Sequence, residues 1–81
     1  MDLSVVEYEK DGHIARVRLN RPEKLNAMNQ AMHDELGLVW KDFRDDKNMR
    51  VAILSGNGRC FSAGADLSGG APEDYVYPRE F

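Results

Sequence analysis

The sequence predicts an α/β domain with elements in the order β-β-α-β, and three observations support this. Apolar and charged residues alternate on both sides of the Asp11–Gly12 pair, which is typical of a β-hairpin. An apolar stripe at helical spacing follows Asn29 and stops before the segment RDDKN (residues 44–48). An uninterrupted apolar run, Val51–Leu54, then indicates a third strand, and a glycine-rich loop follows it.

We expect an antiparallel hairpin over residues 4–19. Glycine accepts positive φ and aspartate bonds its own backbone, so the Asp11–Gly12 pair favours a tight turn. Pro22 has no N–H to donate and restricts the residue before it, so a loop should follow the second strand. The apolar residues of the two strands are Val5, Val6 and Tyr8, then Ile14, Val17 and Leu19.

The central segment predicts an amphipathic helix of about 15 residues. Asn29 is the expected N-cap, because its side chain can accept from a free N–H of the first turn. After such a crossover we expect Val51–Leu54 to be a buried strand that runs parallel to an earlier one. The residues of the apolar stripe are Met32, Leu36, Val39, Trp40 and Phe43.

Composition narrows the class of protein. The chain has 81 residues, a net charge of −3 and no block of basic residues, so we expect one domain at most and no nucleic-acid partner. The N-terminus lacks the pattern of a secretory signal, and the apolar runs are too short to span a membrane. A single cysteine, Cys60, suits a reducing compartment. We therefore expect a cytoplasmic protein with no membrane partner.

Metal chemistry has no support in the sequence. His13, His33 and Cys60 form no ligand cluster of recognised spacing, so no metal site is predicted. We expect both histidines at the solvated surface and Cys60 as a small buried hydrophobe.

The loop GNGRCFSAGADL (residues 56–67) admits several interpretations. Phe61 stands where a dinucleotide loop needs its third glycine, and no Gly-Lys-Ser/Thr of a P-loop is present. The nucleophile elbow around Ser62 is half matched, with Cys60 in place of its first glycine. If a helix began near Gly64–Asp66, its first N–H groups could bind a developing negative charge. A structural loop with Asp66 as a cap is the other interpretation, and residue spacing alone favours it.

Two segments of the sequence are informative together: LNRPEKLNAMN (Leu19–Asn29) and ILSGNGRCFSAGADL (Ile53–Leu67). In this order and at this separation they resemble the N-terminal portion of the crotonase superfamily, the enoyl-CoA hydratase/isomerase family. The resemblance covers about residues 5–68, including the helix between the segments. It implies the N-terminal β-β-α-β part of a crotonase-like (ClpP/crotonase) fold. Residues 1–81 would then be a partial domain, with 1–68 matching the family and 69–81 an irregular tail.

The resemblance also implies an acyl-CoA thioester as the ligand, with coenzyme A as part of the substrate and no other cofactor. In this family two backbone N–H groups stabilise an enolate oxyanion, and the first of them would be the N–H of Ala65. For Lys24, a solvated loop lysine is as good an interpretation as a phosphate contact. The residues expected to line the coenzyme A are Lys24, Leu25, Ala27, Ala63, Gly64, Asp66 and Leu67.

The family's second oxyanion glycine and its acid/base carboxylates lie beyond the matched portion. Glu73, Asp74 and Glu80 therefore receive no catalytic role. A homo-oligomer, a trimer or hexamer, is implied if the full domain is present. The first hypothesis is an incomplete hydratase (lyase) or isomerase of fatty acid metabolism. The second is a non-catalytic fragment that binds coenzyme A or associates with related subunits.

Overall fold

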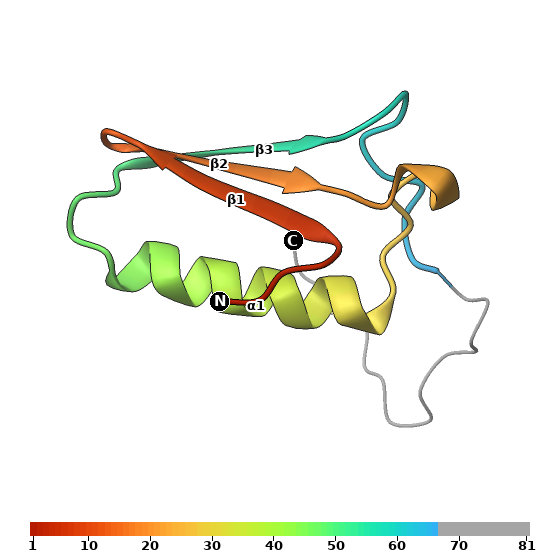
Figure 1. The fold of residues 1–81 in the computed structure, drawn as a ribbon, viewed down its shortest axis with the longest axis horizontal. Coiled ribbons are helices and arrows are strands. Elements are labelled where there is room, and N and C mark those ends of the chain that lie inside the picture. The colour runs from red at the N-terminus through yellow and green to blue at the C-terminus, as the bar shows by residue number, and fades with distance from the viewer. Residues whose placement is uncertain (67–81) are drawn as a thin grey trace, which may run out of the picture.

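The computed structural model describes residues 1–66. Their elements are β1 (Val6–Asp11), β2 (Ile14–Leu19), the 3-10 helix η1 (Pro22–Lys24), α1 (Gln30–Asp45) and β3 (Val51–Gly56). The sheet order is β1-β2-β3, with β1 and β2 antiparallel and β2 and β3 parallel. Helix α1 runs along one face of this sheet (Figure 1). The predicted order of elements and the parallel pairing are confirmed, and the expected tail at 69–81 lies outside the described residues.

The hairpin forms where the sequence pattern places it. Val6 pairs with Leu19 at one end, and Asp11 pairs with Ile14 next to the turn, where Gly12 has φ +60. A positive φ is easily adopted by glycine, which explains the residue at the turn. Successive side chains of β2 point to opposite faces, so Ala15, Val17 and Leu19 are buried toward α1, and the half-buried Ile14 lies with the two arginines on the other face.

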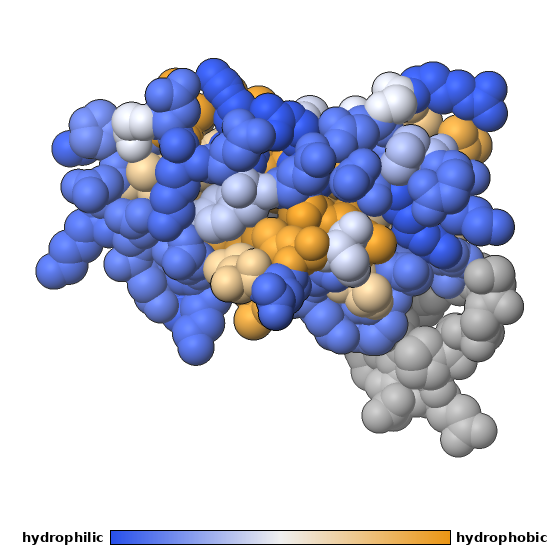
Figure 2. Space-filling view, viewed as in Figure 1, coloured by the Kyte–Doolittle hydropathy of each residue, from blue (hydrophilic) through white to orange (hydrophobic). Residues whose placement is uncertain are grey.

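Helix α1 begins as predicted. The Asn29 side chain accepts a hydrogen bond from the N–H of Met32 at 2.9 Å, which satisfies one of the free donors of the first turn. The N-terminal part of the stripe is buried against the hairpin, whereas Trp40 is 37% exposed and packs edge-to-face with Phe43. Figure 2 shows the resulting apolar band between the sheet and the helix, surrounded by hydrophilic residues. The core residues are Val6, Val17, Leu19, Met32, Leu36 and Val39.

The expectation that Val51–Leu54 is a buried strand is wrong. Val51, Ile53 and Leu54 are 52%, 48% and 42% exposed. Within residues 1–66, β3 pairs only with β2, and α1 packs mainly on β1 and β2. Among the described residues, strand β3 is therefore an edge strand, and its apolar side chains are not covered by a further layer.

Carboxylates of α1 hold the N-terminal segment against the helix. Glu35 accepts hydrogen bonds from the N–H groups of Ser4, Val5 and Val6 and from the Ser4 hydroxyl, at 2.8–3.2 Å. Burial works to raise the pKa of Glu35, but the hydrogen bonds from Val5, Ser4 and Val6 outweigh it, so the pKa is lowered.

A second contact joins α1 to β1. The Tyr8 hydroxyl donates to Asp42 at 2.8 Å, and the Lys10 ammonium binds both Asp42 and Asp46 at 2.8 and 2.7 Å. The hydrogen bond from Lys10 is the largest cause that lowers the pKa of each of these two aspartates. Burial, followed by the bond to Asp42, raises the pKa of Tyr8 to about 12.

Within the described part of the chain, no helix is long and apolar enough to cross a membrane.

Candidate functional site

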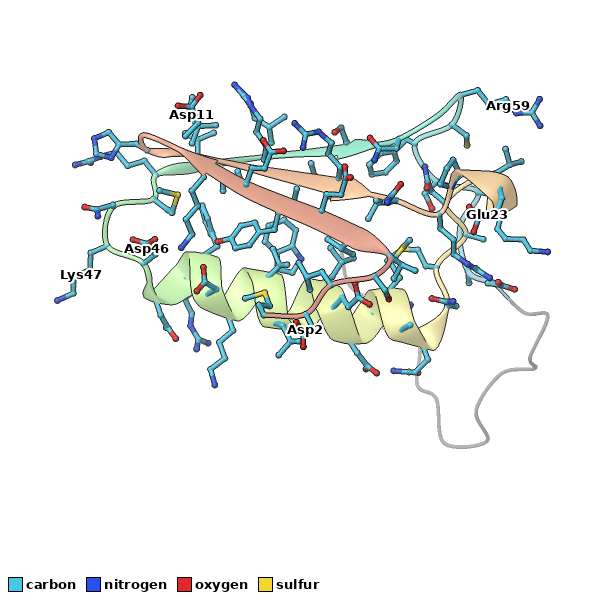
Figure 3. The ribbon with its side chains drawn as sticks, viewed as in Figure 1. Asp2, Asp11, Glu23, Asp46, Lys47 and Arg59 are labelled. Carbon is cyan, nitrogen blue, oxygen red and sulfur yellow. The ribbon has the colours of Figure 1, made fainter. Side chains whose placement is uncertain are left out.

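Two loops meet at one end of the sheet. Loop A comprises residues 20–29, between β2 and α1, and loop B comprises residues 57–66, after β3. Because β2 and β3 are parallel neighbours, both loops leave the sheet at the same end (Figure 1). Figure 3 shows Glu23 of loop A and Arg59 of loop B at this end, with Asp11 and Asp46 at the other.

The two loops continue the parallel pairing beyond the sheet. The N–H of Ala63 donates to the carbonyl of Leu25 at 2.9 Å. Met28 and Ala65 then form an isolated parallel bridge. In it the Met28 N–H donates to the Gly64 carbonyl at 2.8 Å, and the Asp66 N–H donates to the Met28 carbonyl at 3.0 Å. We call these residues, 25–28 and 63–66, the loop ladder.

Within residues 1–66, no helix begins at Gly64–Asp66. Ala65 lies in extended backbone that pairs with Met28, and Gly64 has φ +94, a value that few non-glycine residues adopt. In the described part of this loop, the capacity to bind an anion therefore comes from the orientation of single peptide groups.

The bridge determines the direction of the Ala65 N–H. The carbonyl of Gly64 and the N–H of Ala65 belong to one planar trans peptide group, so they point in opposite directions. Since the Gly64 carbonyl accepts from Met28 of loop A, the Ala65 N–H points away from loop A. The bond to the carbonyl also polarises the same peptide group, which strengthens its N–H as a donor.

Ala65 differs from its neighbours in how its N–H is used. The N–H of Ala63 binds Leu25, that of Gly64 binds the Ser62 hydroxyl at 3.1 Å, and that of Asp66 binds Met28. Within residues 1–66, no acceptor binds the Ala65 N–H, and Ala65 is exposed. Backbone N–H groups are strong donors, so this one can bind an acceptor from outside the loop.

Asn26 connects the loops at their base and was missed by the sequence analysis. It is fully buried. Its side-chain oxygen accepts from the Arg21 N–H at 2.7 Å, and its amide donates to the carbonyls of Asn57 and Cys60 at 2.8 and 2.7 Å. The signal available in the sequence was an asparagine in a loop, since asparagine tolerates the left-handed backbone found here at φ +53.

Arg21 connects the loops near Ala65. Its Nη1 donates to the Ala27 carbonyl at 3.0 Å and to Asp66 Oδ2 at 2.6 Å. The side chains of Arg21 and Asp66 are only 15% and 11% exposed, so this ion pair is largely shielded from water. The Asp66 carboxylate thus binds Arg21, and the residues after Asp66, on which the cap role considered for it depends, lie outside the described part of the chain.

The remaining predicted residues fall into two groups. Leu25, Ala27, Ala63 and Gly64 lie together in the loop ladder, and the exposed Lys24 ends η1 beside it. Leu67 lies outside the described residues.

Ser62 and Cys60 have structural contacts. The Ser62 hydroxyl donates to the Asn26 carbonyl at 2.9 Å and accepts from Gly64, so it joins the two loops. Cys60 is half-buried, not fully buried as expected, and its neighbour Phe61 is 53% exposed. His33 and His13 are exposed as predicted, and the latter bonds the Asn48 carbonyl at the far end of β2. Among residues 1–66, no group of three or more potential ligands is placed to hold a metal ion.

Comparisons with known proteins identify the family of this chain. The family model for enoyl-CoA hydratase/isomerase matches residues 9–80. The short-chain-enoyl-CoA hydratase of Clostridium acetobutylicum is 41% identical over 69 residues, which cover 84% of this chain and 26% of the relative. A mitochondrial Delta(3,5)-Delta(2,4)-dienoyl-CoA isomerase of Mus musculus is 43% identical over 61 residues, which cover 75% of this chain and 19% of the relative.

Solved structures give the same answer for the fold. The crystal structure of an enoyl-CoA hydratase/isomerase from Mycobacterium paratuberculosis superposes with a TM-score of 0.83 at 35% identity, covering 99% of this chain and 30% of that one. The chain spans between 17% and 28% of the length of the curated relatives it matches. It belongs to the enoyl-CoA hydratase/isomerase family of the crotonase superfamily, of whose fold it forms a part.

Proposed function

We propose that this chain contributes one side of an acyl-CoA thioester site, in which the Ala65 N–H donates to the thioester carbonyl oxygen. The observation that supports this is the direction of that N–H. It points away from loop A, and no acceptor within residues 1–66 binds it. The names of the relatives, which are enoyl-CoA hydratases and a dienoyl-CoA isomerase, supply the thioester as the ligand class.

The proposed chemistry is electrostatic. When a proton leaves or a nucleophile adds next to a thioester, negative charge develops on its carbonyl oxygen. A donor already aimed at that oxygen stabilises the charge without reorganising, and one such donor is worth about 3–4 kcal/mol of barrier. In this proposal the loop ladder provides that preorganisation, because it fixes the Gly64–Ala65 peptide before any ligand arrives.

The coenzyme A would lie along the loop ladder. In this proposal Lys24 meets a phosphate, Leu25 and Ala27 flank the ligand from loop A, and small residues of loop B leave room for the thioester. Asp66 would contribute through its main chain, since its carboxylate binds Arg21. The loop B residues of this lining are Ala63, Gly64, Asp66 and Leu67.

The reaction class is hydration or double-bond isomerisation of an enoyl-CoA. Both reactions pass through an enolate and differ in the acid and base that move the proton. We assign neither group to a residue of this chain. The proposal therefore concerns oxyanion stabilisation and binding, and turnover would require the rest of the family's fold.

The test compares two ligands that differ by one oxygen. The ¹⁵N-labelled 81-residue chain is titrated with butyryl-CoA and with S-butyl-CoA, a thioether without the carbonyl. We expect a downfield shift of the Ala65 amide proton with the thioester only, and about two- to tenfold tighter binding of the thioester, as one hydrogen bond provides. Equal shifts at Ala65 with both ligands would contradict the proposal.

A synthetic variant removes the proposed donor. Replacing Ala65 with L-lactate puts an ester oxygen where the N–H was and keeps the methyl group. This chain should bind the two ligands equally, with an affinity for S-butyl-CoA unchanged from the natural chain. A preference for butyryl-CoA that survives the replacement would show that another group binds the carbonyl.

A non-catalytic fragment remains the second candidate, and one observation favours it. Strand β3 exposes Val51, Ile53 and Leu54, an apolar surface suited to association with related chains. Because turnover would require the rest of the family's fold, the ligand pair separates the candidates. Tighter binding of butyryl-CoA than of S-butyl-CoA supports the thioester site, and association of the chain without that preference supports the non-catalytic fragment.

A further inference from the structure

We propose that Arg21 is a positioning residue for the Ala65 N–H, which it holds in place through the loop ladder without touching the ligand. This inference rests on the proposed role of Ala65 as a donor. The observation behind it is that one nitrogen, Arg21 Nη1, binds both strands of the ladder beside the Met28–Ala65 bridge.

The contacts of Arg21 lie next to the bridging residues. Ala27, whose carbonyl accepts at 3.0 Å, immediately precedes Met28. Asp66, whose carboxylate binds at 2.6 Å, immediately follows Ala65. The guanidinium therefore connects the two strands at the place where the Gly64–Ala65 peptide obtains its orientation. A charge-assisted bond with little exposure is stronger than a neutral one, and Arg21 and Asp66 meet that condition.

Arg21 is itself firmly held. Its N–H donates to Asn26 Oδ1 at 2.7 Å, and its carbonyl accepts from the N–H groups of Lys24 and Asn26 at 3.1 and 2.9 Å. Its backbone is thus fixed by loop A, so its side chain acts as a support between fixed backbone and loop B.

The Gly64–Ala65 peptide needs such support. Glycine has no Cβ to restrict rotation, and Gly64 has open space around the position of a Cβ. On loop B the orientation of the Gly64–Ala65 peptide depends on the two hydrogen bonds with Met28. If the strands of the ladder separated at Asp66, both bonds would open and the Ala65 N–H would sample several directions. Arg21 opposes that separation.

The experiment compares Arg21→Met with the matched control Arg18→Met. Arg18 forms a similar pair with Glu9, at 3.0 Å, on the open face of the hairpin. Amide hydrogen exchange is measured in the full 81-residue chain, with the rates of Met28 and Asp66 divided by that of buried Val17. We expect a rise of about tenfold in both ratios for Arg21→Met and no change for Arg18→Met.

Two results would overturn the proposal. The ratios for Met28 and Asp66 could stay at the natural value in Arg21→Met, which would mean that the ladder holds without the guanidinium. Alternatively, Arg18→Met could raise them equally, which would mean that any loss of an ion pair loosens the loops.

The ligand pair used for Ala65 provides the functional readout. In Arg21→Met we expect the preference for butyryl-CoA over S-butyl-CoA to fall toward unity, while the affinity for S-butyl-CoA stays the same. A merely structural role would weaken both ligands alike and would contradict positioning. If the natural chain itself has no preference, the role of Ala65 fails. If that preference exists and survives Arg21→Met, the role of Arg21 alone fails.

Discussion

At the scale of single residues, Asn26 makes three of the polar contacts between loop A and loop B, with Asn57, Cys60 and Ser62. Its side chain satisfies one N–H and two carbonyls inside a space without water access, since it is 0% exposed. Gly56 packs closely against it: a Cβ at Gly56 would lie 2.9 Å from Asn26 Nδ2 and 2.8 Å from the Phe61 Cα. The small residue at 56 and the amide at 26 therefore depend on each other.

Replacing Asn26 with alanine should lower the free energy of unfolding by about 3 kcal/mol, because three buried polar groups lose their partner at about 1 kcal/mol or more each. Urea denaturation followed by circular dichroism measures the change. Asn48→Ala is the control: because Asn48 is exposed, its replacement should change the urea concentration at the midpoint of unfolding only a little. Equal shifts for the two variants would mean that the loops do not depend on the Asn26 amide.

The residues that build the candidate site were harder to predict than those that line it. Ala65 was identified from a family motif, and its N–H does have a distinct geometry. Arg21 and Asn26 were not identified, because their contacts with Asp66, Asn57 and Cys60 join positions 31 to 45 residues apart. Such contacts leave no periodic pattern in the sequence.

At the scale of elements, local patterns predicted most of the fold. The turn at Asp11–Gly12 and the cap at Asn29 depend on neighbouring residues, so they could be read from the chain. The burial of Val51–Leu54 depends on which layers cover the strand, and it was predicted wrongly. The same holds for the loop ladder, because its pairing joins residues far apart in the sequence and no local pattern predicts it.

The carboxylates that join α1 to the N-terminal segment and β1 predict a loss of stability in acid. The pKa values of Glu35, Asp42 and Asp46 are lowered from ordinary values of 4.5, 3.8 and 3.8. A carboxylate with a lowered pKa in the folded state stabilises the fold above its ordinary pKa, and this contribution is lost as the pH falls through the folded value. The urea concentration at the midpoint of unfolding should therefore decrease as the pH is lowered below about 4.5.

Glu35→Gln tests the carboxylate that accepts the largest number of these hydrogen bonds. The variant should be less stable than the natural chain at neutral pH and should lose less stability on acidification, because one titrating group has been removed. Glu23→Gln, at an exposed position on η1, should keep the acid dependence of the natural chain. An unchanged pH profile in Glu35→Gln would assign the acid sensitivity to other groups.

Tyr8, with its pKa raised to about 12, adds a contribution to the stability of the fold that is lost only in strong alkali.

At the scale of the whole molecule, the described residues form one side of a larger arrangement. A single helix covers a three-stranded sheet, and the apolar residues of β3 lack a covering layer within residues 1–66. A chain of this size buries only about 60–65% of the surface of its unfolded form, so the isolated domain should be marginally stable.

The exposed edge of β3 predicts that the isolated chain associates with further copies of itself as its concentration rises. Three of its residues are apolar and 42–52% exposed, the strand carries no charged side chain, and within the described residues its outer edge has no pairing partner. Edge strands of this kind template further pairing, and a lysine on them opposes it. Ile53→Lys should therefore reduce the average mass measured by sedimentation equilibrium toward that of the monomer.

Leu38→Lys is the matched control for this prediction. Leu38 is 51% exposed, as much as Ile53, but it lies on helix α1 and has no free strand edge beside it. If general apolar exposure drove association, the two substitutions would reduce the mass equally. If β3 is the associating edge, only Ile53→Lys reduces it, because a lysine there places like charges close together across any pairing of two β3 strands near their centres.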